Sequence, residues 1–444
     1  MSQLPFSRTK DRSGRSVPSS RLSRLARFGS MAGGVAGGML LDGARQLAQG
    51  KRPSLTDLLL TPANAVRVTH QLANLRGAAM KMGQLMSMDG GDFLPAELSE
   101  IMGRLRADAE HMPQSQLQAV LDLRWGPGWQ DRFTGFGFTP IAAASIGQVH
   151  RATTSDGRDL AIKVQYPGVR ASIDSDVGNV GTLMKMSGLL PATLDIAPML
   201  IEARRQLHEE ADYEREARYL ARFGSLLADA PDFIVPALHA DFTKPSVLAM
   251  SYVEGVPVES LETAPQAERD RVMTLLITLL LRELFEFALM QTDPNFANYR
   301  YQPATQKLVL LDFGASREIA PSLAADYRRL LRAGFAAEGA AARQAMLDLG
   351  FFDARTRPHH QEAVLAAFES AMAPMRTPGL FDFGDQSLPA QLREQGMELA
   401  ADREFWHIPP IDTLFLQRKF GGLFLLGSRL KARVDLRALL GPYL

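Results

Sequence analysis

The stretch Phe287-Ala-Leu-Met-Gln-Thr-Asp-Pro-Asn-Phe-Ala-Asn298 is followed fourteen residues later by Asp312-Phe313-Gly314, and together they carry the strongest signal in this chain. A nucleotide triphosphate carries its charge on oxygens, so its site needs hard oxygen ligands for Mg²⁺ and a carboxylate near the attacking group. Asp312 and Asn298 supply such metal ligands, and Asp293 is expected to orient the nucleophile or accept its proton. Their order and spacing predict a phosphoryl-transfer site.

Each of these pieces is common by itself, because Asp-Phe-Gly arises by chance and Asp-Pro-Asn also forms turns. The upstream segment 136–165 strengthens the prediction. It holds two β-rich runs, 147–152 and 159–165, joined by Ser155-Asp156-Gly157, which is a strong hairpin signal. In a kinase N-lobe such a strand pair encloses the nucleotide phosphates, and Lys163 is the strand lysine expected to contact them.

The turn before this hairpin, 140–147, is alanine-rich where a kinase has G-x-G-x-x-G. Methyl groups restrict the positive φ values that glycine allows, so this turn should be stiffer and sit differently on the phosphates. A further apolar strand, 247–253, ends at Glu254-Gly255, where a hinge between two lobes is expected. The residues expected to contact the nucleotide are Ala142, Ala143, Ala144, Ser145, Lys163, Met250, Tyr252 and Val253.

Helical patterns account for most of the remaining chain. The segment 195–226 is predicted to be one long helix, on which Asp212 and Glu216 share a face. A charged helix of this kind is usually a solvated surface, but Lys163 needs a helix carboxylate as its partner, and Glu216 is the one we expect. A long apolar helix, 269–290, leads into the catalytic loop. Further helices are predicted at 323–350, 361–375, 389–402 and 413–426.

Composition excludes several functions. The 444 residues carry 49 basic and 49 acidic side chains, so no global field points to nucleic acid. Zero cysteines exclude disulfides, thiolate metal sites and cysteine catalysis. No apolar stretch reaches the length that spans a bilayer, and one candidate, 272–290, is interrupted by Arg282, Glu283 and Glu286. The run 419–427 is either a membrane-facing or partner-facing patch or buried core, and buried core is favoured.

The N-terminal part of the chain precedes the predicted lobes. Residues 1–29 carry seven basic side chains against one acid and are expected to be a disordered tail, with a lipid-binding arm or an organellar transit peptide as alternatives. The glycine-rich segment 30–54 is expected to be a linker or a membrane-proximal stretch. A helical extension follows, on which Lys81 and Gln84 share a face. The expected domains are the tail 1–29, the glycine-rich segment 30–54, the extension 55–125, an N-lobe with an insert 126–254, and a helical C-lobe 255–444.

Six motifs in this order resemble the UbiB family of atypical kinases, over about residues 30–435. They are Lys81-Met-Gly-Gln84, Ala142-Ala-Ala-Ser-Ile-Gly-Gln-Val-His150, Ala161-Ile-Lys163, Glu210-Ala-Asp212, Gln291-Thr-Asp-Pro-Asn295 and Leu311-Asp-Phe-Gly314. Gln-Thr-Asp-Pro-Asn in place of His-Ala-Asp-Pro-His is similar to the branch that supports coenzyme Q (ubiquinone) biosynthesis. The resemblance implies an α+β, bilobal protein-kinase-like fold with a helical N-terminal extension packed over the active site.

The resemblance also implies how the site is completed. Lys81 and Gln84 would reach toward the nucleotide and toward the pair Glu210 and Asp212. One departure is Ser251 in the hinge, where the family pattern has Glu, and it leaves the adenine-side contacts open. The implied cofactors are ATP and Mg²⁺, with Mn²⁺ as an alternative. The catalytic candidates are Asp293, Lys163, Glu216, Lys81, Gln84, Glu210 and Asp212, and the metal ligands are Asn298 and Asp312.

Three functions fit these residues. The first is Mg²⁺-dependent ATP hydrolysis coupled to the handling of membrane-bound ubiquinone precursors. Its partners would be those lipids, an anionic membrane surface, other ubiquinone-biosynthesis proteins and a second copy of the chain, but no nucleic acid. The second is a kinase acting on a lipid, a small molecule or a protein, and the third is a nucleotide-sensing scaffold. The expected location is the cytoplasmic side of a bacterial inner membrane, with the mitochondrial matrix as the alternative.

Overall fold

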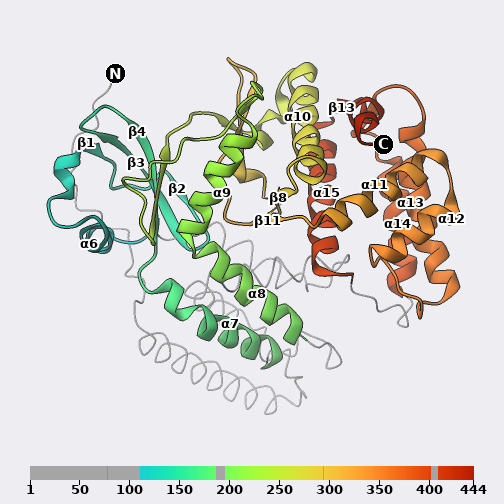
Figure 1. Cartoon of the computed structure of the whole chain (residues 1–444), viewed down its shortest axis with the longest axis horizontal. Helices are drawn as coiled ribbons and strands as arrows, with labels where there is room; N and C mark the ends of the chain where they lie inside the picture. Colours follow the sequence, from blue (N-terminus) through green and yellow to red (C-terminus); the bar gives the residue numbers. More distant parts are fainter. Residues whose placement is uncertain (1–77, 79–110, 187–195, 294, 402–408) are drawn as a thin grey trace, which may run out of the picture. The chain divides into compact units, whose positions relative to one another are not determined.

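The computed structural model describes residues 78, 111–186, 196–293, 295–401 and 409–444 (Figure 1). The chain divides into two compact units. The first unit consists of the chain up to Ala217 together with Ala237–Tyr252. The second unit consists of Arg218–Pro236 together with Val253–Leu444. The predicted basic tail, the glycine-rich segment and most of the helical extension lie outside the described residues.

The first unit is built on a five-stranded sheet in the order β1-β3-β4-β6, with β2 also paired to β3. All of these pairings are antiparallel. The predicted hairpin is confirmed, because β3 pairs with β4 and Gly157 in the connecting turn has φ +88°, a left-handed conformation that favours glycine. The strands are β1 Phe133–Phe136, β2 Ala142–Ala143, β3 Gly147–Thr154, β4 Asp159–Gln165 and β6 Val247–Ser251.

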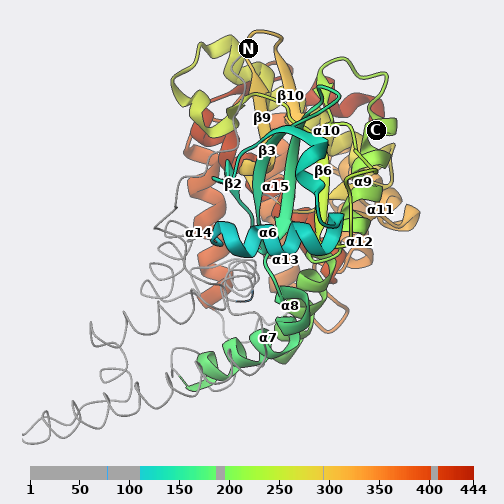
Figure 2. The same ribbon diagram turned by 90° about the vertical axis from the view of Figure 1, so that its left-hand side faces the viewer.

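An aromatic core joins this sheet to helix α6, Gln114–Trp125. Figure 2 shows α6 crossing the strands of the sheet, and Leu117 and Leu121 are fully buried there. The indole of Trp125 stacks on Phe133 at 5.3 Å between ring centroids. A short 3₁₀ turn, Trp129–Arg132, links the helix to β1. The last part of the predicted helical extension, 55–125, is therefore part of the core of this unit.

A buried polar chain also ties the start of this unit to the sheet. The amide of Met112 donates to Oε1 of Gln148, whose Nε2 lies 2.8 Å from Nε2 of His150. Nδ1 of His150 is 2.7 Å from the carbonyl oxygen of Gly137. Burial lowers the pKa of His150 to about 4, so the ring is neutral near pH 7, with Nδ1 donating and Nε2 accepting.

The prediction of one long helix over 195–226 is wrong. After α7, Val169–Met186, the chain forms two helices, α8 Ala197–Glu210 and α9 Tyr213–Leu226. The break falls at Asp212, whose Oδ1 accepts the backbone N–H of Arg215 at 2.9 Å. An aspartate in this position satisfies one of the free amides at the start of a helix, so Asp212 begins α9.

The described residues of the second unit form three small sheets. A four-stranded sheet has the order β5-β10-β9-β7, and two-stranded pairs are formed by β8 with β11 and by β12 with β13. The strands are β5 Phe233–Ile234, β7 Val256–Pro257, β8 Leu289–Gln291, β9 Tyr299–Gln302, β10 Lys307–Leu310, β11 Ser316–Glu318, β12 Phe381–Asp382 and β13 Arg433–Val434.

Two predicted helices of this unit end earlier than expected. The first, α10, is Gln266–Phe285 and does not continue to 290. Ala288 follows it with φ +49°, and the chain then forms β8. The segment predicted as one helix over 323–350 is two, α11 Pro321–Ala336 and α12 Gly339–Asp348, separated at Ala337 with φ +57°. A left-handed residue ends an α-helix, and here alanine adopts that conformation without the glycine that usually signals it.

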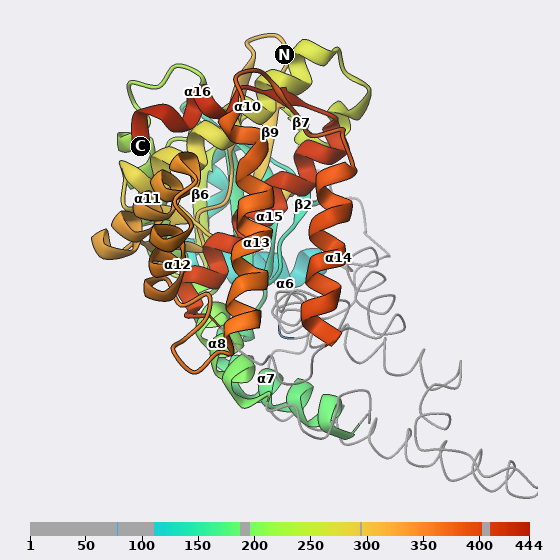
Figure 3. The same cartoon turned by 90° about the vertical axis from the view of Figure 1, so that its right-hand side faces the viewer.

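The remaining helices are confirmed as α13 Pro358–Arg376, α14 Ser387–Ala401 and α15 Ile411–Leu430, and Figure 3 shows them together. Two short turns, α16 Leu436–Leu440 and a 3₁₀ turn Gly441–Tyr443, end the chain. The run 419–427 is partly buried core, because Lys419, Leu423, Leu426 and Gly427 are buried whereas Gly421 and Leu425 are exposed. Among the residues placed by the structure, no helix is long and apolar enough to cross a membrane.

Candidate active site

Lys163 lies on β4, the strand between β3 and β6, opposite Val149 on one side and Leu248 on the other. Its Nζ lies 2.8 and 3.0 Å from the two carboxylate oxygens of Glu216, in the first turns of α9. Lys163 is 7% exposed and Glu216 is 1% exposed. The structure thus brings together the lysine and the helix carboxylate that were predicted to be partners. Removal of either partner would deprive the other buried charge of this ion pair, which is a destabilising change.

Tyr213 packs beside this ion pair, with Nζ of Lys163 5.2 Å from its ring centroid. The first residue of β3, Gly147, approaches the same tyrosine closely. A Cβ added at Gly147 would lie 2.7 Å from the Tyr213 hydroxyl and 2.5 Å from the carbonyl oxygen of Val164. Only glycine fits here without displacement of the backbone, so this residue sets how closely the alanine-rich turn approaches the ion pair.

The alanine-rich turn adopts ordinary backbone angles. Ala142 and Ala143 form β2 and are exposed, whereas Ala144 and Ser145 are half-buried. The amide of Ala144 donates to the carbonyl of Gly147 and closes the turn at 2.9 Å. None of the positive φ angles among the described residues falls in this turn. It therefore lacks the left-handed positions that a glycine-rich phosphate loop uses, as its composition predicted.

Glu210 and Asp212 flank the bend between α8 and α9. The hydroxyl of Ser145 donates to Oε2 of Glu210 at 2.8 Å, which fastens the alanine-rich turn to the end of α8. The Asp212 carboxylate caps α9 instead. The two acids are close in sequence but make different contacts. Their predicted companions, Lys81 and Gln84, lie outside the described residues.

The strand end that was expected to contact adenine is held by the sheet. Met250 is 6% exposed, and the amide of Tyr252 donates to the carbonyl of Asp159 at 2.9 Å. The Arg151 guanidinium lies 3.9 Å from the Tyr252 ring centroid. The amide and ring of Tyr252 are thus already engaged. Val253 is the next residue and belongs to the second unit.

Ser251, which departs from the family pattern, has its own side-chain contact. Its Oγ lies 3.0 Å from Nε2 of His239. Burial and the nearby Arg158 guanidinium lower the pKa of His239, which favours the neutral ring at this contact. The hydroxyl is therefore directed to His239 within the first unit.

In the second unit the catalytic loop is compact. Asp293 and Asn298 are joined by a hydrogen bond of 3.2 Å from Nδ2 of Asn298 to Oδ2 of Asp293. The other Asp293 oxygen accepts the Asn295 amide at 3.3 Å. A short 3₁₀ turn, Phe296–Asn298, is capped by the Asn295 side chain. This turn brings the side chains of Asp293 and Asn298 together despite the four residues between them.

Two sets of bonds join this loop to the Asp-Phe-Gly triplet. The amide of Leu311 donates to the carbonyl of Asn298 at 2.9 Å, and both the amide and the hydroxyl of Thr292 donate to the carbonyl of Ala315. Oδ1 of Asp312 accepts the Gly314 amide at 2.9 Å. Phe313 is 1% exposed and packs against Phe223 with ring centroids 5.0 Å apart. The triplet and the loop therefore form one framework.

The oxygen donors of this framework suit Mg²⁺. The ion prefers oxygen ligands, is commonly bound through one or two carboxylates, and takes its other ligands from water and substrate phosphates. Asp312 and Asn298 offer a carboxylate and an amide oxygen. Within the described ranges there is no cluster of three or more His, Cys, Asp or Glu side chains that would form an all-protein metal cage. The donor set fits a metal that arrives with a phosphate ligand.

Sequence reasoning missed four residues that contact the candidate groups. Tyr213 packs on Lys163, and Glu283, Lys419 and Tyr299 surround the ends of the catalytic loop. For two of these residues the sequence contained a feature that could have identified them. Glu283 and Lys419 are charges within mainly apolar helical segments, and both are buried.

The fold and these residues define a protein-kinase-like enzyme, and comparison with known proteins agrees. Residues 104–346 match the ABC1 atypical kinase-like domain. The chain is 38% identical to the mitochondrial atypical kinase COQ8 of Saccharomyces cerevisiae, over 94% of this chain and 84% of the yeast protein. It is 27% identical to the probable protein kinase UbiB of Marinobacter nauticus, over 67% of this chain and 56% of that protein.

A solved structure is also similar. The complex of Rv3197 with erythromycin from Mycobacterium tuberculosis superimposes with a TM-score of 0.60 at 25% identity, covering 86% of this chain and 96% of that one. The chain belongs to the ABC1 atypical kinase-like family. The predicted family, the kinase-like α+β fold and the predicted enzyme class are therefore confirmed.

Proposed function

We propose that this protein binds ATP with Mg²⁺ and transfers its terminal phosphoryl group to water or to a small acceptor in support of ubiquinone biosynthesis. The observation that carries the proposal is the buried contact between Lys163 and Glu216. A strand lysine held by a helix glutamate is the arrangement that protein kinases need in place for phosphoryl transfer. A buried ion pair of this kind contributes little net stability to the fold, because the cost of desolvating the two charges offsets much of their attraction.

The proposed roles follow from the chemistry of each group. Lys163 contacts the phosphates, and Glu216 holds its ammonium in position. Asp312 and Asn298 hold Mg²⁺, which neutralises charge on the phosphates when it is bound. Asp293 orients the attacking oxygen and takes its proton. Its carboxylate is half-buried and accepts two hydrogen bonds, which hold it in a fixed orientation for this role.

The alanine-rich turn supports transfer to water or a small molecule rather than to a protein side chain. The turn is fastened to α8 through Ser145 and Glu210. Lys81 and Gln84 of the extension, with Glu210 and Asp212, are proposed to complete the site and to cover it. The proposed partners are lipid-soluble ubiquinone precursors, an anionic membrane surface, other ubiquinone-biosynthesis proteins and a second copy of the chain. The proposed location is the inner-membrane surface of a bacterium, with the mitochondrial matrix as the alternative.

Phosphate release from Mg-ATP tests the proposal. The purified protein is assayed with and without anionic liposomes and a ubiquinone-like phenol, beside Asp312→Asn and the matched control Glu394→Gln, an exposed carboxylate on α14. We expect turnover that is stimulated by the lipid and phenol, lost in Asp312→Asn and kept in Glu394→Gln. Equal turnover by Asp312→Asn would contradict the assigned metal ligand, and tight ATP binding without any release would favour the nucleotide-sensing scaffold.

A further inference from the structure

Two charged side chains of the second unit are buried in its helical core. Glu283 on α10 is 0% exposed and Lys419 on α15 is 2% exposed. Nζ of Lys419 lies 2.5 Å from Oε2 of Glu283. An ion pair in this position gives little net stability over well-packed apolar residues, so its other contacts become informative.

Both charges bind the main chain of Gln291. Nζ of Lys419 donates to the Gln291 carbonyl at 2.6 Å, and Oε1 of Glu283 accepts the Gln291 amide at 3.2 Å. Gln291 is the last residue of β8, which pairs with β11 along one edge. The amide of the next residue, Thr292, donates to the carbonyl of Ala315 along that same edge. Because bonding directions alternate along an antiparallel strand, the Gln291 groups point to the free edge of β8. The ion pair occupies that edge.

The same lysine reaches the other end of the catalytic loop. The hydroxyl of Tyr299 interacts with the Lys419 ammonium and helps to raise the pKa of the lysine, and Tyr299 is 4% exposed. Burial alone would lower the pKa of Lys419, but Glu283 and Tyr299 raise it, so the ammonium keeps its charge. Residues 291 and 299 enclose the loop that carries Asp293 and Asn298. One cation therefore contacts the residues directly outside both ends of that loop.

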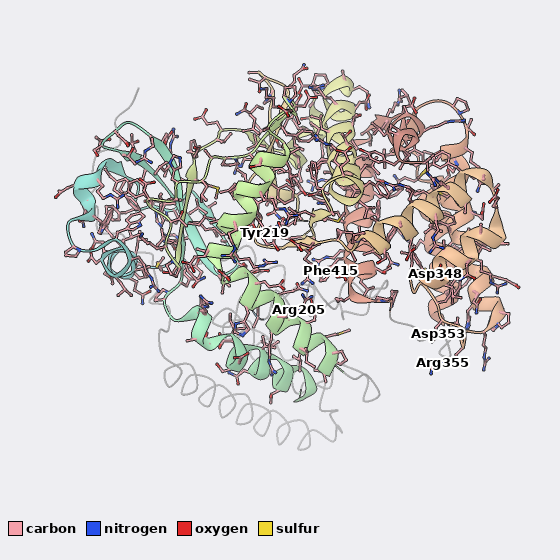
Figure 4. The ribbon with its side chains drawn as sticks, in the orientation of Figure 1. Arg205, Tyr219, Asp348, Asp353, Arg355 and Phe415 are labelled. Atoms are coloured by element: carbon pink, nitrogen blue, oxygen red, sulfur yellow. The ribbon has the colours of Figure 1, made fainter. Side chains whose placement is uncertain are left out.

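Helix α15 also supports the neighbouring strand. Phe415 lies four residues before Lys419 and is labelled on α15 in Figure 4. The Arg317 guanidinium of β11 lies 4.2 Å from its ring centroid. Residues four apart share one face of a helix, so this face of α15 contacts β8 through Lys419 and β11 through Phe415. These are the strands that adjoin the catalytic loop and the Asp312 triplet.

We propose that Glu283 and Lys419 are positioning residues that fix the separation of the two ends of the loop 292–298, and thereby the placement of Asp293 and Asn298. Neither side chain touches a reacting group. The expected effect on catalysis rests on the proposed function. The statement that the pair holds both ends of the loop rests only on its contacts with residues 291 and 299. Misplacement of a reacting group by about 1 Å lowers rates by about 100-fold, which is the scale on which such a brace acts.

The test compares four proteins. In Glu283→Leu/Lys419→Met both charges are removed together, so no unpaired charge is left in the core. Tyr299→Phe removes only one hydroxyl from Lys419 and is the milder variant in case the double variant does not fold. The matched control, Thr413→Val, loses a buried hydrogen bond of α15 to the carbonyl of Leu349 without contacting the loop. Each is compared with the wild type.

Two readouts are measured, ATP turnover and amide hydrogen exchange of peptides covering 289–300. For the double variant we expect kcat to fall about 10- to 100-fold with KM for ATP changed less than about threefold, and exchange in 291–299 to become faster. Tyr299→Phe should shift both readouts in the same direction by less, and Thr413→Val should shift neither.

The two readouts separate the inference from the proposed function. If the wild type does not turn over ATP, the proposed function fails, and the exchange data alone decide whether the pair holds the loop. Wild-type exchange across 291–299 in both the double variant and Tyr299→Phe would overturn the inference. A rise in exchange equal to that of Thr413→Val would do the same.

Discussion

Replacing Lys163 with methionine should destabilise the first unit strongly, because Glu216 would remain buried at 1% exposure after losing the Lys163 ammonium. Loss of one partner from a buried pair costs about 3–5 kcal/mol. For a unit of this size, 1 kcal/mol shifts Tm by about 2–4 °C, so we expect Lys163→Met to lower Tm by about 6–20 °C. The double variant Lys163→Met/Glu216→Leu should recover most of this loss, since replacing both charges with apolar residues is often neutral.

Thermal unfolding and urea unfolding, both followed by tryptophan fluorescence, measure the changes in Tm and in the free energy of unfolding for the first unit. Trp125 and Trp129 lie in the first unit, and a Trp406→Phe background leaves them as the only tryptophans. Arg205→Met is the control. Arg205, labelled on α8 in Figure 4, pairs with Glu202 at the surface, so its loss should cost less than about 1 kcal/mol.

The refuting result is a Lys163→Met protein as stable as the Arg205→Met control. It would show that Glu216 is neither paired nor buried when the first unit is folded. ATP turnover is measured in parallel and should be lost in both the single and the double variant. Recovery of stability without recovery of turnover separates the chemical role of the pair from its structural one.

Other changes should have measurable effects of different kinds. The folded pKa of His150 is about 4, below the usual 6.5, so its contribution to stability, about 3 kcal/mol in all, is present above pH 6.5 and is lost as the pH falls toward 4. His150→Gln should make the urea midpoint depend less on pH over this range, and an unchanged pH dependence would contradict the buried neutral ring. Gly147→Ala should cost about 1–3 kcal/mol in the same assay, because its Cβ would meet the Val164 carbonyl at 2.5 Å, and wild-type stability would show that β3 can move away. Asn298→Ala should raise the Mg²⁺ concentration needed for half-maximal turnover by at least about tenfold, and an unchanged Mg²⁺ titration would remove Asn298 from the metal site.

Local patterns predicted the parts of the fold that local physics determines. Strand β4 has the predicted bounds, 159–165, and the turn before it contains the glycine that its left-handed angle requires. The partner of Lys163 was predicted from chemistry, since a phosphate-contacting lysine needs a carboxylate and the following helix offered Glu216. The structure places these two groups in contact.

The wrongly predicted helix boundaries share one cause: in each case the helix is interrupted at a residue other than glycine or proline. Ala288 and Ala337 adopt left-handed angles that alanine rarely takes, and only their surroundings impose them. Asp212 begins a helix where the apolar period continues without interruption. The contact of Lys419 with Glu283 joins residues 136 positions apart, so its meaning depends on packing that no local pattern encodes.

Single-turnover phosphate release from Mg-ATP by Asp293→Asn, measured beside its equilibrium affinity for ATP, tests the assigned chemistry most directly. A carboxylate that orients and deprotonates the attacking group contributes about 100- to 10,000-fold to the rate. We therefore predict that Asp293→Asn binds ATP within about threefold of the wild type and releases phosphate at least about 100-fold more slowly. Release at the wild-type rate would contradict the account, because phosphoryl transfer would then not depend on the loop that carries Asp293.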